Sequence, residues 1–291
     1  MFKRVLVFGS SGYVGSEFVH QLASTSGVSV HAAPPHNTMK SFRAVIDVIR
    51  SSRPDLVINA AGYTGKPNVD ACEADKGRCI HGNITFPLWI AQACDVVGVA
   101  FGHVSSGCIY NGYDKKYTEE DAPDFSFEQN NCSFYSGTKA QAEQLLREFN
   151  NTFIWRLRIP FNHENSPRNY LTKMLSYPTI LDLANSVSHR EEFVTSCLQL
   201  VKIQATPGIY NVTNPGSITA KRLFELFVEN RPETAYTIAS KVFFSSIEEF
   251  MSQVKAARSN CVLDDAKLRA TGVVMRPVEE AIVDSIKKYQ L

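Results

Sequence analysis

The chain has 291 residues, with 30 Lys and Arg against 29 Asp and Glu and a formal net charge of +1 at pH 7. This length suits one large domain or a nucleotide-binding domain with a smaller companion, and the balanced charge excludes a general attraction to nucleic acid or anionic lipid. The cysteines form no C-x-x-C pair, which argues against a disulfide framework and a zinc site. We therefore expect a cytoplasmic, enzyme-sized protein with no metal and no membrane span.

Short apolar runs alternate with longer amphipathic segments through the first half of the chain. The apolar runs predict strands at residues 4–8, 28–32, 55–59, 99–104 and 153–158. The amphipathic segments predict helices at residues 13–24, 41–50, 70–97 with an interruption near Pro87, and 133–149. Alternation of this kind is typical of an α/β, Rossmann-like, doubly wound parallel sheet with helices on both faces.

The regular alternation weakens after Pro160, where prolines become frequent. We expect a dinucleotide-binding domain over residues 1–160 and a smaller C-terminal substrate-binding lobe over residues 161–291. Weak strands at 179–181 and 209–212 are candidates to return to the sheet. Further helices are predicted at residues 219–229, 246–253, 265–270 and 278–289. The acidic stretch 113–131 is interpreted as a solvated loop, with a lid as the second interpretation.

The segment VLVFGSSGYVG places three glycines where a strand gives way to a helix. They form a G-x-x-G-x-x-G pattern, which permits a tight turn and close approach of the backbone to a pyrophosphate, while the helix N-terminus offers unpaired N–H groups. The pattern predicts a dinucleotide site. Its residues are Gly9, Ser10, Ser11, Gly12, Tyr13, Val14 and Gly15.

This glycine spacing resembles that of the short-chain dehydrogenase/reductase superfamily. A second segment, NAAG, is similar to the motif that the superfamily places beside the adenine and ribose. Its residues are Asn59, Ala60, Ala61 and Gly62. A third, SFYSGTKAQAE, contains Tyr135 and Lys139 at the spacing of the superfamily's catalytic pair, which also contacts the cofactor.

The choice between NADPH and NADH depends on the residues after the second predicted strand. An NAD-binding site would have an acid there to accept from the ribose 2′-OH, and VHAAPPHNTMKSFR has none. His36, Lys40 and Arg43 are instead candidates to meet a 2′-phosphate. We expect NADPH, with NADH as the alternative.

Tyr135 and Lys139 lie one helical turn apart and therefore share a face. A phenol is a weak acid at neutral pH, and we expect the Lys139 charge to move the pKa of Tyr135 toward the working range. Tyr135 would then protonate the alkoxide formed when a hydride reaches a carbonyl carbon. The superfamily's catalytic hydroxyl corresponds to Ser106, and Ser105 is interpreted as structural.

Further segments resemble the plant-type bifunctional UDP-4-keto-6-deoxyglucose 3,5-epimerase/4-reductase family over nearly the whole chain. The segments are NAAGYTGKPNVDACE, SSGCIY, FYSGTKAQAEQLLREF, RLRIP, SPRNYLTKM, YNVTNPG and RSNCVLDDAKL. The resemblance implies NADPH-dependent epimerisation at C3 and C5 and reduction at C4 of a UDP-4-keto-6-deoxy sugar, yielding UDP-L-rhamnose. It also implies that Cys108 and Lys173 carry the protons of epimerisation.

Binding of a UDP-sugar requires cations against the diphosphate. Arg258 is the main candidate on the resemblance, with help from Arg168 and Asn169, while Lys66 and Asn68 are expected to border the sugar. The family's arginines after the second strand are replaced here by APPHN. Cofactor preference therefore cannot be transferred directly.

Two other functions remain open. The chain also resembles the dTDP-4-dehydrorhamnose reductases, which would make it a reductase without epimerase activity, and a non-catalytic NADP-binding regulatory subunit is a third possibility. An upstream 4,6-dehydratase is expected as metabolic supplier. The sequence leaves open UDP against dTDP and the oligomeric state, a homodimer included.

Overall fold

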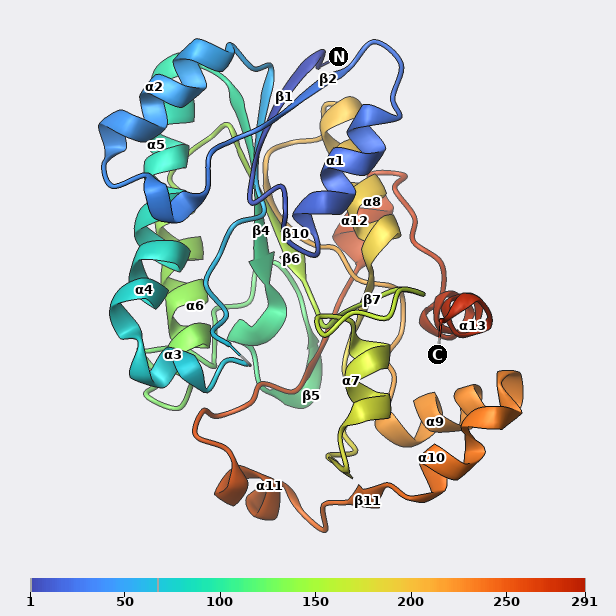
Figure 1. The fold of residues 1–291 in the computed structure, drawn as a ribbon. Coiled ribbons are helices and arrows are strands. Elements are labelled where there is room, and N and C mark those ends of the chain that lie inside the picture. Colours follow the sequence, from blue (N-terminus) through green and yellow to red (C-terminus); the bar gives the residue numbers. More distant parts are fainter. Residues whose placement is uncertain (1, 67, 291) are drawn as a thin grey trace.

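The computed structural model describes residues 2–66 and 68–290 and has a six-stranded sheet in the order β10-β6-β4-β3-β1-β2 (Figure 1). The strands are β1 (Arg4–Phe8), β2 (Ser29–Ala32), β3 (Leu56–Asn59), β4 (Ala100–Ser106), β6 (Thr152–Leu157) and β10 (Gly208–Asn211). All neighbouring pairs are parallel. The chain adds β2 on one side of β1 and β3 on the other, and open α/β sheets bind ligands at such a switch point.

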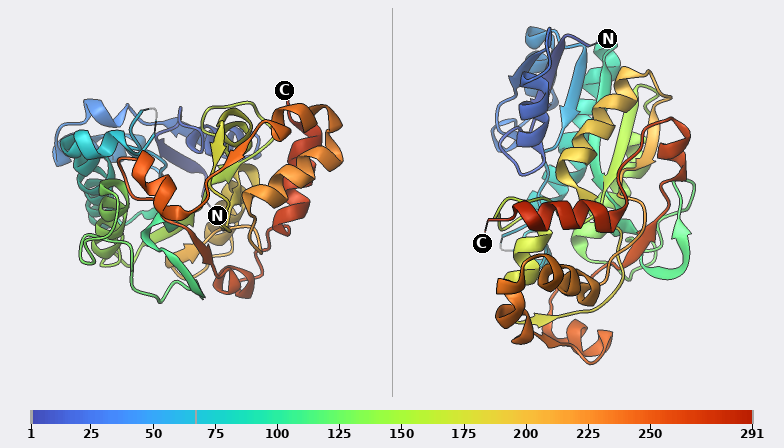
Figure 2. Two further views of the ribbon diagram at one scale, coloured as in Figure 1. Left: turned by 90° about the horizontal axis from the view of Figure 1, so that it is seen from below. Right: turned by 90° about the vertical axis from the view of Figure 1, so that its right-hand side faces the viewer.

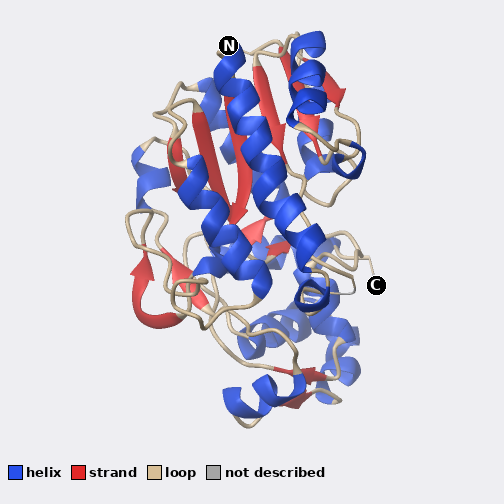
Figure 3. Ribbon diagram, turned by 90° about the vertical axis from the view of Figure 1, so that its left-hand side faces the viewer, coloured by secondary structure: helices blue, strands red, loops and turns tan. Residues whose placement is uncertain are grey.

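Both faces of the sheet are covered by helices, which confirms the predicted fold class. Side chains alternate along β1, so that Leu6 and Phe8 enter one apolar core and Val5 and Val7 enter the other. The first face carries α2, α5 and α6, and Figure 3 looks onto these helices in front of the strands. The covering helices are α2 (Phe42–Ser52), α5 (Phe86–Val97), α6 (Phe134–Leu146), α1 (Gly15–Ala23), α8 (Arg190–Lys202) and α12 (Ala266–Ala270).

Helix α8 is absent from the predicted elements, yet it covers much of the second face. Its Phe193 packs edge-on against Phe18 of α1, with ring centroids 6.5 Å apart, and Phe18 stacks on Trp155 of β6. Strand β10 follows α8 and pairs with β6, which confirms the predicted return of residues 209–212 to the sheet. The layers of the nucleotide-binding fold therefore extend well past residue 160.

The remaining chain forms a lobe beyond the carboxyl ends of the strands (Figures 1 and 2). Its elements are α7 (Tyr170–Ser176), α9 (Ala220–Asn230), α10 (Ala235–Ala239), α11 (Ile247–Gln253), α13 (Val278–Lys288), β8 (Thr179–Ile180) and β11 (Val242–Phe243). β8 pairs with β11 and not with the central sheet. The predicted return of 179–181 to that sheet is wrong because Ile180 is buried in the lobe's own core.

The segment 70–97 is broken differently from the prediction. It consists of α3 (Ala71–Ala74), α4 (Lys76–Ile80), a π-helical turn (His81–Thr85) and α5. Pro87 does not interrupt it, because it lies in the first turn of α5, where a missing N–H is tolerated. The interruptions are at Asp75, which has non-helical dihedral angles, and at the π turn, a feature that often marks functional sites.

The acidic stretch is not wholly a loop. Its first part forms β5 (Gly112–Tyr117), which pairs with β12 (Cys261–Leu263), so the solvated-loop interpretation is wrong for residues 113–117. A third small pair joins β7 (Pro160–Phe161) and β9 (Ser188–His189). No helix in the described part of the chain is long and apolar enough to cross a membrane.

Candidate active site

The glycine loop packs against the turn that follows β3. Gly9 has φ +76°, and a Cβ at this position would lie 2.4 Å from the backbone nitrogen of Ala61. A Cβ at Gly15 would lie 2.0 Å from the carbonyl oxygen of Gly9. Both glycines are therefore required by close backbone approach, and the N-terminus of α1 faces the cradle between the two segments. The predicted segments 9–15 and 59–62 are adjacent, as a dinucleotide site requires.

Asn59 fixes the second of these segments. Its side chain is fully buried, and its Oδ1 accepts a hydrogen bond of 3.0 Å from the backbone N–H of Ala61. Its Nδ2 lies 3.1 Å from Nδ1 of His103 on the neighbouring strand β4. The asparagine therefore fixes the backbone of the 59–62 turn and ties it to β4.

The predicted catalytic side chains come together at the carboxyl end of β4. Ser133 caps α6 by accepting a 3.1 Å hydrogen bond from the backbone N–H of Ser136, which sets the first turn that carries Tyr135. Lys139 follows one turn later, only 5% exposed, and a Cβ on Gly62 would lie 3.8 Å from its Nζ. The ammonium group therefore faces the 59–62 turn.

The two serines at the end of β4 have different surroundings. Ser106 is close enough to Tyr135 for its hydroxyl to lower the pKa of the phenol, against the larger effect of burial. Ser105 donates a 2.5 Å hydrogen bond to Glu143 in the buried layer beneath. The interpretation of Ser105 as structural is confirmed.

Burial dominates the acidity of Tyr135. It raises the pKa of the phenol well above its usual value, the thiols of Cys108 and Cys72 act in the same direction, and Ser106 opposes them. The charge of Lys139 is not among the largest influences on this pKa, so its expected effect on the phenol stays a prediction. Burial also lowers the pKa of Lys139. Tyr135 therefore keeps its proton at neutral pH, the form in which it can protonate an alkoxide.

The pKa values of the two predicted proton carriers of epimerisation are shifted in opposite directions. Burial raises the pKa of the Cys108 thiol, while the hydroxyls of Ser106 and Ser136 lower it by hydrogen bonding. Burial lowers the pKa of Lys173 on α7, and the charge of Arg168 adds to this effect. The thiol is thus favoured as the proton donor and the amine as the proton acceptor.

The predicted substrate cations contact the segment after β3. Arg168 Nη1 donates a 2.8 Å hydrogen bond to Oγ1 of Thr64, and Arg258 pairs with Asp70 at 2.8 Å. The first contact joins the loop before α7 to the segment that follows the 59–62 turn. The second leaves Arg258 held beside the same segment, where its role toward a diphosphate stays a prediction.

Three other candidates for substrate binding differ in the exposure and hydrogen bonding of their side chains. Lys66 is exposed, whereas Asn68 accepts a 2.9 Å hydrogen bond from the backbone N–H of Asp70. Pro67, between the two candidates, lies outside the described residues. Asn169 is fully buried as the N-cap of α7 and donates 2.7 Å and 2.6 Å hydrogen bonds to the carbonyl oxygens of Asn162 and Glu164. Its assignment to the substrate is corrected to a structural cap.

The residues after β2 form a small cationic group. Burial lowers the pKa of His36, and the charges of His81 and Lys40 lower it further, which places these groups near one another. Arg43 pairs with Asp47 at 2.8 Å on the exposed side of α2. His36 and Lys40 therefore remain candidates for the 2′-phosphate, whereas Arg43 already has an acidic partner.

The sequence analysis missed Asn83, a fully buried residue in the π turn. Its Oδ1 accepts a 2.8 Å hydrogen bond from the backbone N–H of Tyr63, and its Nδ2 donates 2.9 Å and 3.1 Å hydrogen bonds to the Tyr63 carbonyl and the Thr138 hydroxyl. Asn83 thus ties the cradle wall to α6, which carries Tyr135 and Lys139. A polar residue within an apolar helical stretch was the only available signal.

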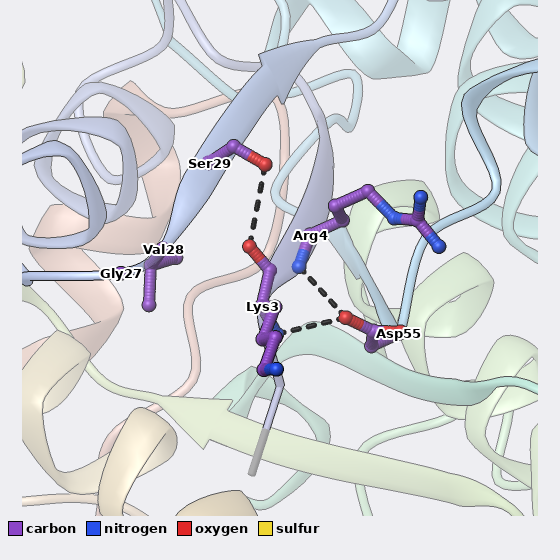
Figure 4. Close-up of a pocket in the computed structure, with 6 residues that line it drawn as sticks. All are labelled: Lys3, Arg4, Gly27, Val28, Ser29 and Asp55. Atoms are coloured by element: carbon purple, nitrogen blue, oxygen red, sulfur yellow. Dashed lines mark hydrogen bonds between the residues drawn. The ribbon is translucent and has the colours of Figure 1, made fainter.

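A separate surface cavity of about 560 Å³ lies away from this site (Figure 4). It adjoins the amino ends of β1 and β2, opposite the edge that carries the glycine loop. Oδ2 of Asp55 accepts 2.8 Å hydrogen bonds there from the backbone N–H groups of Lys3 and Arg4, so this carboxylate serves to join the two backbone segments. Among the described residues, no group of three or more His, Cys, Asp and Glu side chains could hold a metal ion.

Comparison with known families settles the relationship. The family model for the RmlD substrate binding domain matches residues 3–291. The chain belongs to this family. The RmlD-type chain is 31% identical over 287 residues to an Arabidopsis thaliana bifunctional dTDP-4-dehydrorhamnose 3,5-epimerase/dTDP-4-dehydrorhamnose reductase, covering 96% of itself and 90% of the relative. The family resemblance predicted from the motifs is confirmed.

Other relatives are longer or have known structures. The RmlD-type chain is 31% identical to an Arabidopsis thaliana trifunctional UDP-glucose 4,6-dehydratase/UDP-4-keto-6-deoxy-D-glucose 3,5-epimerase/UDP-4-keto-L-rhamnose-reductase, but it spans only 41% of that protein. The L780 UDP-rhamnose synthase of Acanthamoeba polyphaga mimivirus has a similar structure, with a TM-score of 0.89, 26% identity and coverage of 98% and 99%. A Bacillus anthracis dTDP-4-dehydrorhamnose reductase solved with NADP shares the fold, with a TM-score of 0.78 and 22% identity over 99% of each chain.

Proposed function

We propose that this protein catalyses NADPH-dependent 3,5-epimerisation and 4-keto reduction of a UDP-4-keto-6-deoxy sugar, yielding UDP-L-rhamnose. The observation that carries the proposal is that Tyr135 packs against the apolar cluster that contains Cys108, while Ser106 accepts a hydrogen bond from the backbone N–H of Cys108 and lies close to the Tyr135 phenol. The names of the UDP-rhamnose synthase and epimerase/reductase relatives support the same substrate class.

The reduction needs a hydride and a proton. NADPH, bound in the cradle between the glycine loop and the 59–62 turn, supplies the hydride to C4 of the sugar. The Tyr135 phenol donates its proton to the oxygen at C4, and the Ser106 hydroxyl holds that oxygen by a hydrogen bond. Lys139, almost fully buried and facing the 59–62 turn, orients the cofactor side of the site.

Epimerisation uses the same ketone. The carbonyl at C4 acidifies the hydrogens at C3 and C5, so a neutral amine on Lys173 can remove one of them while the electron pair moves onto the C4 oxygen. The Cys108 thiol then returns a proton to the opposite face of the carbon. The lowered pKa of Lys173 and the raised pKa of Cys108 favour this division of roles.

The function is tested by supplying UDP-4-keto-6-deoxyglucose and NADPH in heavy water. We expect consumption of NADPH, UDP-L-rhamnose as the product, and deuterium at both C3 and C5, because each epimerisation exchanges a carbon-bound hydrogen with solvent. Parallel assays with NADH and with the dTDP-linked sugar measure the specificity for the cofactor and for the nucleotide of the substrate. Failure to consume either cofactor with any of these sugars would rule out the proposal.

Changing Cys108 to Ala should separate the two reactions. We expect deuterium uptake at C3 or C5 to fall by about 100-fold, because a positioned proton carrier contributes that order of rate. Reduction of an already epimerised UDP-4-keto-rhamnose should persist, since Tyr135 remains. Mass spectrometry of the products measures both effects.

Cys132→Ala is the matched control, because Cys132 is a partly exposed cysteine just before α6 that neither reaction uses. Normal deuterium uptake in Cys108→Ala would remove Cys108 from the mechanism. A wild-type protein that reduces dTDP-4-keto-rhamnose but exchanges no hydrogen would instead be the reductase without epimerase activity.

We also propose that a 4,6-dehydratase supplies the substrate. A 4-keto-6-deoxy sugar must come from a reaction of that class, and one longer Arabidopsis thaliana relative carries a UDP-glucose 4,6-dehydratase in its name. The cytoplasm is the compartment that fits a chain with seven free cysteines.

A further inference from the structure

Arg158 is a buried cation without an acidic partner. It directly follows β6, is 5% exposed, and forms no ion pair with any carboxylate in residues 2–66 and 68–290. The other deeply buried arginines are paired, Arg156 with Glu143 at 2.8 Å and Arg190 with Glu17 at 2.9 Å. A buried guanidinium with no counter-charge costs several kcal/mol, which is tolerated where a ligand supplies the compensation.

The contacts of Arg158 fix its guanidinium but leave its charge uncompensated. Its Nη2 donates hydrogen bonds of 2.5 Å to Oδ1 of Asn185 and 2.7 Å to the carbonyl oxygen of Ser259, and both acceptors are neutral. Its Nε is sealed from solvent and has no acceptor among the described residues. The group is therefore held in place with a donor and a full positive charge left over.

This charge lies beside the reacting end of the site. Arg158 is close enough to Cys108 to lower the pKa of its thiol, although burial, the largest influence, raises it. Ser259 follows Arg258, the candidate for the diphosphate, and its hydroxyl donates to the carbonyl oxygen of Tyr110 just after Cys108. Arg158 thus lies near the thiol and contacts the segment that carries Arg258.

The backbone next to Arg158 is strained. Ile159 has φ +37°, in the left-handed region that a β-branched residue rarely adopts. This dihedral angle turns the chain from β6 into β7, and such outliers are kept where the surrounding structure requires them, often at functional sites. The strain accompanies the placement of the Arg158 side chain.

We propose that Arg158 is the cation that stabilises the thiolate left on Cys108 when this residue gives its proton to the sugar carbon during epimerisation. When Lys173 removes the proton from C3 or C5, the electron pair moves onto the C4 oxygen and an enolate forms. When the Cys108 thiol returns a proton to the carbon, a thiolate remains and later recovers a proton from solvent. The thiolate is an anion, so the fixed guanidinium near it favours the thiolate over the neutral thiol. This inference rests on the proposed function.

Two substitutions test the role of the charge. Arg158→Met keeps the length of the side chain and removes its charge. Asn185→Asp places a carboxylate within 2.5 Å of Nη2 and compensates the charge without removing the guanidinium. The Nδ2 of Asn260 lacks an acceptor, and rotation of that amide would let it donate to the new carboxylate, so the second change is compatible with the fold.

We expect deuterium uptake at C3 and C5 to fall by about 100-fold in Arg158→Met and by about 10-fold in Asn185→Asp, as for the loss of one electrostatic stabiliser. Reduction of already epimerised UDP-4-keto-rhamnose should change by no more than about threefold, since it relies on Tyr135. The alkaline limb of the uptake profile should also move to higher pH in Arg158→Met, because the Cys108 thiol loses a charge that lowers its pKa.

Arg147→Met, at an exposed arginine just after α6, is the matched control and should leave both reactions unchanged. Uptake at the wild-type rate in Arg158→Met, or a parallel fall of uptake and reduction with an unmoved pH profile, would overturn the inference. If the wild-type protein neither exchanges nor reduces the sugar, the proposed function itself fails. If the wild-type protein is active and Arg158→Met and Asn185→Asp leave its activity unchanged, only the inference about Arg158 fails.

Discussion

Tyr135→Phe is expected to lower the rate of 4-keto reduction by about 1,000-fold, the order of effect of a positioned general acid. Phenylalanine keeps the ring among Cys108, Tyr110 and Ala140 and removes only the hydroxyl that protonates the C4 oxygen. NADPH should still bind, because the glycine loop and the 59–62 turn are unchanged. Stopped-flow or steady-state oxidation of NADPH and a separate binding titration measure the two quantities.

Tyr236→Phe is the matched control, since Tyr236 is 87% exposed in the lobe and should tolerate the loss of its hydroxyl. Because burial raises the pKa of Tyr135, the wild-type phenol keeps its proton through mildly alkaline solution, and reduction should not decline there through this group. Persistent turnover of every candidate 4-keto sugar by Tyr135→Phe would contradict a catalytic role. A wild-type protein that binds NADPH but turns over none of these sugars would favour the non-catalytic NADP-binding subunit.

Glu143→Gln is expected to destabilise the protein by about 3–5 kcal/mol, the usual cost of leaving one member of a buried ion pair alone. Glu143 and Arg156 are 1% and 0% exposed, and Arg156 donates hydrogen bonds of 2.8 Å and 3.0 Å to the carboxylate. Ser105 donates a third. Glutamine preserves the shape but leaves the guanidinium without a counter-charge. The midpoint of urea unfolding measures the loss.

The double variant Glu143→Gln with Arg156→Met is the control for this prediction. It removes both charges, so it should recover much of the stability lost by the single change. A single-variant loss below about 1 kcal/mol, the range of exposed pairs, would show that the pair is not desolvated in solution.

The sequence predicted those parts of the fold and site that depend on local patterns. Strands β1 and β3 are short apolar runs, and the glycine loop between β1 and α1 is needed for close backbone approach. Helix α8 escaped prediction because its buried face includes Arg190 and Cys197, so its pattern does not stand out as apolar. Only the tertiary contacts with α1 and β6 reveal why that face is buried.

Motif matching also failed to separate ligands from structural residues. Asn169 lies in a characteristic segment, but its side chain caps α7, and no spacing rule distinguishes a cap from a contact to substrate. The burial that raises the pKa of Tyr135 could not be predicted either, because the distance to Lys139 along a helix is visible in the sequence whereas desolvation is not. The contacts of Asn83 depend on its position in the π turn, which no local sequence motif predicted.

The late return of β10 to the sheet has a consequence for biosynthesis. Until α8 and β10 have been made, one face of the nascent sheet would leave Phe18 and Trp155 uncovered and β6 as a bare edge. A fragment cut near residue 160 would therefore be prone to aggregate. The sheet that carries the cofactor site is therefore complete only when the chain has been made through Asn211.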